Sequence, residues 1–173
     1  MSLLERLKRT PQPHKPRLSL VLHSMGMLLV EQKQINIERD RDLDWEYDHL
    51  NECVHYAKML ALRRKLDPDI AASAVAVQNI GRITSGKSEG HAEAGYELSK
   101  KLFFALGCFT LIEVERLATS VRNHSRKDKV DSPLDELAKD VDVYVRYISG
   151  DEFETSHEIR RLSTIRLELQ MKL

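Results

Sequence analysis

The sequence predicts an all-helical fold. Apolar residues recur at three- and four-residue steps in successive segments, the pattern of amphipathic helices. Only seven glycines and five prolines occur in 173 residues, and 42% of the residues are hydrophobic while 31% are charged. These proportions are typical of a helical protein that can bury one substantial core. We therefore expect a single, compact multi-helix domain over residues 17–173.

The N-terminal residues 1–16 are expected to form a flexible arm. Pro11, Pro13 and Pro16 lack a backbone donor and push their predecessors out of helical geometry. The same prolines interrupt the apolar run that a signal peptide needs. We therefore expect a cytoplasmic protein.

The first helix is predicted to begin at Leu18 and to end near Gln34. Its apolar stretch is shorter than the roughly 20 residues that cross a bilayer, so we expect a core helix and no membrane contact. Residues 36–48 are dense in charge and predict a loop or a short turn leading into the next helix. From Leu50 to Leu66 apolar residues again recur at helical spacing.

A strong helix start follows at Asp67, which can cap the next helix with Pro68 at its first position. This helix runs to about Val77 and is apolar almost all round, which predicts deep burial. The polar pair Gln78-Asn79 at its end is therefore expected to face the interior.

The second half of the chain predicts a loop followed by four helices. Residues 84–90 are rich in glycine and serine and predict a solvated loop. The basic run 122–129 is expected to be a solvated helix end. The last helix is expected to pack on its own domain. The four helices are predicted at about 91–106, 110–124, 134–148 and 152–171.

The charge balance argues against some partners. Lys and Arg total 27 and Asp and Glu total 27, so no net field draws the chain to nucleic acid or to an anionic membrane. A local phosphate site is still compatible with this balance.

Six short motifs, taken in order, carry a resemblance to a known family. They are His49-Leu-Asn-Glu-Cys-Val-His-Tyr-Ala-Lys-Met-Leu-Ala, Leu66-Asp67-Pro68, Gln78-Asn79-Ile80-Gly81-Arg82, Gly90-His91-Ala-Glu-Ala-Gly95-Tyr-Glu97, Val121-Arg-Asn-His124 and Asp140-Val-Asp142-Val-Tyr144. Over about residues 45–147 this series resembles the HD-domain metal-dependent phosphohydrolases. The resemblance implies a compact HD-like helical bundle.

The resemblance also implies a set of metal ligands. His49 and Asp142 match the family's first metal position, and His91 and His124 match its second. By residue type these four could hold one divalent ion, such as Mn, Fe, Ni, Co, Zn or Mg. The spacing of His49 and His55 places them about 240° apart on a helix, so only one of them can face such a site.

The chain departs from the family at its name-giving motif. Where the family has a His-Asp pair that binds the first metal and bridges to the second, this chain has Gln78-Asn79. Neutral amides replace neither the imidazole nor the carboxylate charge, so metal affinity and occupancy are expected to be low. The two amides can instead cap the helix and hydrogen-bond neighbouring imidazoles.

These observations predict a phosphohydrolase-like protein with a degraded metal site, impaired in hydrolysis and retained for binding a phosphate-containing small molecule or a protein partner. Arg82 and Lys87 are the predicted phosphate contacts, and no catalytic residue is assigned. One alternative is an active phosphohydrolase of nucleotides or other phosphomonoesters with a rearranged metal site. Another is a structural module that forms a homo-oligomer.

Overall fold

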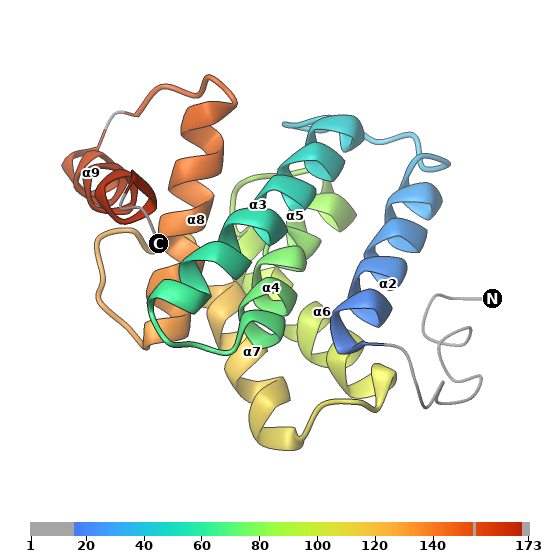
Figure 1. Cartoon of the computed structure of the whole chain (residues 1–173). Coiled ribbons are helices and arrows are strands. Elements are labelled where there is room, and N and C mark those ends of the chain that lie inside the picture. Colours follow the sequence, from blue (N-terminus) through green and yellow to red (C-terminus); the bar gives the residue numbers. More distant parts are fainter. Residues whose placement is uncertain (1–15, 154, 171–173) are drawn as a thin grey trace.

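The computed structural model describes residues 16–153 and 155–170, and all regular structure in these residues is α-helical (Figure 1). The predicted all-helical fold is confirmed. Residues 1–15 of the predicted arm lie outside the described part of the chain. The helices are α2 (Arg17–Gln32), α3 (Leu43–Arg63), α4 (Pro68–Ala76), α5 (Ile80–Ser85), α6 (His91–Leu106), α7 (Leu111–Asn123), α8 (Pro133–Ile148) and α9 (Ser156–Gln170).

Helix α4 is the centre of the molecule. It contacts α2, α3, α7 and α8, and every residue from Ile70 to Ala76 is buried, as its all-round apolar sequence predicts (Figure 1). The Asp67 carboxylate accepts hydrogen bonds from the backbone N–H groups of Asp69 and Ile70, and Pro68 occupies the first turn. The predicted cap is confirmed. Gln78 and Asn79, which follow α4, therefore lie in the interior, where both are buried.

Helix α3 begins earlier than the sequence predicts. The region 36–48 was expected to be a loop or a short turn, but α3 starts at Leu43. The Asp42 carboxylate caps it by accepting from the N–H of Trp45 at 2.6 Å. Acidic residues favour a helix N-terminus because they complement its dipole, so the charge density here marks a helix start. The longer helix adds Glu46 to the buried residues near His49.

Helix α5 is a short element that the periodicity does not predict. It extends to Ser85, into the expected loop, and ends at Gly86 in the left-handed region with φ 76°. The backbones of α5 and α6 come very close at Gly81. A Cβ added there would lie 2.0 Å from the carbonyl oxygen of His91. This contact places the first turn of α6 against the first turn of α5.

Helix α9 begins at Ser156, four residues later than predicted, and packs on α8 and α3 of its own chain. It lies on the side of the molecule opposite α2 (Figure 1). Its residue Ile165 is fully buried and belongs to the same continuous hydrophobic core as Leu18 of α2. In the part of the chain that the structure describes, no helix has the length and apolar character needed to cross a bilayer.

Candidate functional site

Three predicted site residues meet in a buried cluster just beyond the C-terminal end of α4. His49 comes from α3, Gln78 follows α4, and Asp142 comes from α8; each is at most 6% exposed. The Nε2 atom of His49 lies 3.2 Å from Asp142 Oδ1 and 3.2 Å from Gln78 Nε2. Gln78 Nε2 also donates to Asp142 Oδ1 at 3.4 Å and to the Sγ of Cys53 at 3.3 Å. The Gln78 amide is therefore hydrogen-bonded into the cluster.

The two amides differ in what they do. Gln78 contacts an imidazole, as expected, whereas Asn79 is the N-cap residue of α5 without a side-chain capping bond. Two atoms of the cluster, Gln78 Oε1 and His49 Nδ1, are buried with no hydrogen-bond partner among the described residues. Each such unpaired group costs about 1–3 kcal/mol of stability.

Asp142 is paired with a cation. The ammonium of Lys127 donates to Asp142 Oδ2 at 2.7 Å, and the guanidinium of Arg146 lies 3.9 Å from the same oxygen. Burial raises the pKa of the Asp142 carboxyl, but its attraction to Lys127 and His49 outweighs burial and holds that pKa well below its ordinary value. Asp142 is therefore ionised at neutral pH.

His91 and His124 form a second pair, with their Nε2 atoms 3.1 Å apart. Each ring donates its Nδ1 hydrogen to a backbone carbonyl at 2.6 Å, that of Ser88 for His91 and that of Val121 for His124. Burial lowers the pKa of His91 and lowers that of His124 to about 3. Neutral rings with protonated Nδ1 atoms present two Nε2 lone pairs to each other, and such lone pairs are the ones that bind metal ions.

The predicted phosphate contacts are both engaged in ion pairs. Arg82 binds the buried Glu46 carboxylate, with Nε 2.5 Å from Oε1. Its guanidinium also lies over the ring of Trp45, which stacks on His49 at 4.6 Å. Lys87 pairs with Glu38 at 2.9 Å on the surface. Arg82 therefore supports the cluster from outside, and Lys87 lies at the surface away from it.

A basic cavity of about 210 Å³ opens beside His91. Its lining includes Arg122 and Arg126, and the Nε atom of Arg122 is buried without a hydrogen-bond partner among the described residues. Helix α6 starts at this cavity with Gly90 as its N-cap and without a side-chain cap. The cavity is lined by Ser88, Gly90, His91, Ala92, Glu93, Arg122, Ser125 and Arg126.

Sequence reasoning missed Lys127 and the cavity arginines. The run 122–129 was expected to be a solvated helix end, but the side chain of Lys127 is only 10% exposed. The one available signal was Asp142, because a buried carboxylate needs a cation, but the sequence does not tell which basic residue supplies it. The expectation of a wholly solvated run was wrong at Lys127.

Fold and site together define a helical domain with imidazoles and an aspartate gathered around a buried central helix. The HD domain family model matches residues 47–147, more than half of the chain, and the chain belongs to this family. It is also similar to the crystal structure of a predicted HD superfamily hydrolase from an uncultured Thermotogales bacterium, with 22% sequence identity and a TM-score of 0.57. That likeness covers 98% of this chain and 96% of the other. A search of curated proteins found no match.

HD domains typically depend on metal ions, and the residues here do not fit a two-metal centre. In the described residues, no group of three or more His, Cys, Asp or Glu side chains is arranged to hold a metal ion. Asp142 is bound by Lys127 and by His49, and Gln78 can offer a metal only its neutral amide oxygen Oε1, which carries no charge to offset that of the ion. His91 and His124 present two Nε2 lone pairs, which are too few ligands for a two-metal centre.

Proposed function

We propose that this HD domain binds a phosphate-containing small molecule and does not hydrolyse phosphate esters by two-metal chemistry. The observation that carries the proposal is Gln78-Asn79, which stands where the family resemblance places the His-Asp pair. Two neutral amides supply no charge to offset divalent ions and no carboxylate to bridge them. Without those ions, nothing in the cluster lowers the pKa of a water molecule for attack on phosphorus.

The cavity beside His91 supports the binding of an anion. Arg122 and Arg126 present guanidinium groups, which bind phosphate oxygens in pairs of hydrogen bonds. The first backbone N–H groups of α6 point from a helix start without a side-chain cap, and such groups favour negative charge. Glu93 also lines the cavity and pairs with Arg126 at 3.7 Å, so a bound phosphate would compete with this carboxylate. Arg122 is therefore the stronger expected contact.

The hydrolysis half of the proposal is tested by metal analysis and enzyme assay. We expect purified protein to hold less than stoichiometric metal, and to show no turnover of p-nitrophenyl phosphate or nucleoside monophosphates with Mn²⁺, Co²⁺, Ni²⁺ or Mg²⁺. Stoichiometric metal with turnover, both lost in His124→Ala, would contradict the proposal and establish an active phosphohydrolase.

The binding half is tested by calorimetric titration with inorganic phosphate and AMP. We expect saturable binding that weakens at least tenfold in Arg122→Met, since a charge-assisted pair of hydrogen bonds contributes about 1.5–3 kcal/mol. Arg116→Met is the matched control, because Arg116 is an exposed arginine of the same helix outside the cavity lining. Equal loss in both variants, or no binding by the unmodified protein, would leave a structural module as the better description.

An active phosphohydrolase with a rearranged mononuclear site is the second candidate. The observation that favours it is the His91 and His124 pair, whose Nδ1 atoms are fixed by backbone carbonyls as in many metal-binding histidines. Two ligands are few for a resident metal, and His49 and Asp142 are engaged with each other. This candidate therefore requires Asp142 to leave Lys127.

A further inference from the structure

Lys127 is coordinated like a bound cation. It lies in the loop after α7, and its side chain turns inward so that only 10% of it is exposed. Its ammonium lies 2.7 Å from Asp142 Oδ2, 2.7 Å from the carbonyl oxygen of His124 and 3.3 Å from the carbonyl oxygen of Lys139. A lysine ammonium has three hydrogens and no acceptor, so each hydrogen has one oxygen. No donor is left over for a ligand.

The carboxylate of Asp142 is equally engaged. Oδ2 accepts from Lys127, while Oδ1 lies 3.2 Å from His49 Nε2 and 3.4 Å from Gln78 Nε2. A divalent ion on Asp142 would have to displace one of these partners. It would also sit within a few ångströms of a positive charge in a largely buried site, where repulsion between like charges is weakly screened.

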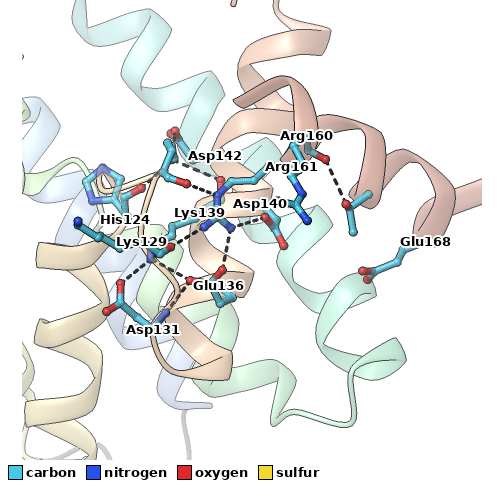
Figure 2. A network of polar contacts seen from close by, with 12 residues as sticks. His124, Lys129, Asp131, Glu136, Lys139, Asp140, Asp142, Arg160, Arg161 and Glu168 are labelled. Carbon is cyan, nitrogen blue, oxygen red and sulfur yellow. Dashed lines mark hydrogen bonds and ion pairs between the residues drawn. The ribbon is translucent and has the colours of Figure 1, made fainter. Parts of the chain in front are cut away.

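The side chain of Arg161 holds the backbone of Lys127 in this position. Arg161 of α9 donates from Nε to the carbonyl oxygen of Lys127 at 2.9 Å, and from Nη2 to that of Lys129 at 2.8 Å. Figure 2 shows Arg161 reaching from α9 toward the loop and toward Asp140 on α8. The loop that carries the ammonium is therefore fixed from outside by the last helix.

We infer that the Lys127 ammonium is the resident cation of this HD centre, bound to Asp142 in place of a divalent metal ion. The inference rests on the proposed loss of two-metal chemistry and adds a second cause to it. Gln78-Asn79 removes metal ligands, and Lys127 supplies a positive charge that keeps Asp142 from becoming one. Restoring the His-Asp pair alone then fails to restore metal binding.

The test compares three variants by titration with Mn²⁺ and Ni²⁺. We expect Gln78→His with Asn79→Asp to bind no better than the unmodified protein, and the further change Lys127→Met to tighten binding at least tenfold. Methionine keeps most of the length of the lysine stem and removes its charge. The control adds Lys129→Met, which removes an exposed lysine two residues away and should give no gain. Equal affinity with and without Lys127 would overturn the inference.

A second measurement applies if the triple variant does not fold. Thermal unfolding is compared for Lys127→Met, Asp142→Asn and the two together. A buried pair loses more stability when one partner is removed than when both are, so we expect each single change to lower Tm by roughly 10 °C and the double change to lower it by less than the sum. Additive losses would show that the two groups do not act as a pair.

The outcomes separate this inference from the proposed function. Stoichiometric metal in the unmodified protein defeats both. An unmodified protein without metal, together with tight binding by Gln78→His with Asn79→Asp, leaves the proposed function standing and defeats the role of Lys127.

Discussion

At the scale of single residues, burial and a neighbouring charge fix the protonation states of His124 and Asp142. Burial lowers the pKa of His124 to about 3, so its ring is neutral at physiological pH. Asp142 is also buried, but the ammonium of Lys127 holds its pKa well below the ordinary range. Asp142 and Lys127 thus form a charged pair, while burial keeps the nearby His124 ring neutral.

The neutral state of His124 predicts acid sensitivity. Below its ordinary pKa of 6.5 the unfolded chain takes up a proton that folded His124 does not accept until about pH 3. The folded-state pKa is lowered, so this residue's share of stability is present above pH 6.5 and is lost as pH falls toward 3. The slope for one proton is about 1.4 kcal/mol per pH unit.

Denaturant unfolding at several pH values measures this slope. His124→Gln, which cannot take up the proton, should show a shallower loss of stability between pH 6.5 and 4 than the unmodified protein. Ser125→Ala, at the next and exposed position, should keep the full slope. Identical slopes in all three proteins would mean that His124 becomes protonated in the folded state.

At the scale of elements, the close approach of α5 and α6 depends on a missing side chain. Gly81 lets the backbone of α5 reach the first turn of α6, which carries His91 to His124. The sequence contains this glycine inside the matched motif. Only the structure shows why a larger residue does not fit there, because the carbonyl oxygen of His91 occupies the space that a Cβ would need. Its substitution should therefore disturb both stability and the histidine pair.

Gly81→Ala should destabilise the protein by several kcal/mol, because the added Cβ meets backbone that cannot move aside. Gly26→Ala is the matched control. Gly26 also lies in a helix, nothing stands within 4 Å of a Cβ added there, and alanine should stabilise that helix by about 0.5–1 kcal/mol. Thermal unfolding of the two variants should shift in opposite directions; a shift of the same sign in both would contradict the packing argument.

At the scale of the whole molecule, ion pairs join the C-terminal helix to the rest. Arg161 pairs with Glu136 and Asp140 of α8 (Figure 2). Arg64 of α3 pairs with Asp140 and with Glu168 of α9. Both arginine side chains are at most 20% exposed. Pairs in such positions are screened less by salt than surface pairs.

Removing one member of this network should loosen α9. Arg161→Met is expected to lower stability by roughly 1–3 kcal/mol, since it breaks hydrogen bonds to two carboxylates and two carbonyl groups. Arg160→Met, at the adjacent exposed position, should be nearly neutral. Hydrogen exchange should show faster exchange in α9 of the first variant alone, and equal exchange in both would show that α9 is held by Ile165 and its apolar neighbours.

The formation of a homo-oligomer stays a prediction. Phe104, Leu111 and Ile112 are large apolar side chains, each more than two thirds exposed, near the turn between α6 and α7. Light scattering of the purified protein measures the oligomeric state directly.

The sequence alone determined the helical fold, the capped and buried α4, and the motifs that lead to the HD family. These follow from local rules, because periodicity, Asp67-Pro68 and the burial of an all-apolar helix depend on neighbours in sequence. It misplaced the start of α3 and missed α5, since charge density and glycine content describe a helix end and a loop equally well.

Tertiary structure decided which charged groups meet. Lys127 and Asp142 lie 15 residues apart in sequence, and no local pattern distinguishes Lys127 from the exposed Lys129 beside it. The difference arises because α8 and the loop after α7 present three oxygen acceptors to one ammonium and none of these to the other. Electrostatic contacts depend on distance and burial, which the fold sets and the order of residues does not.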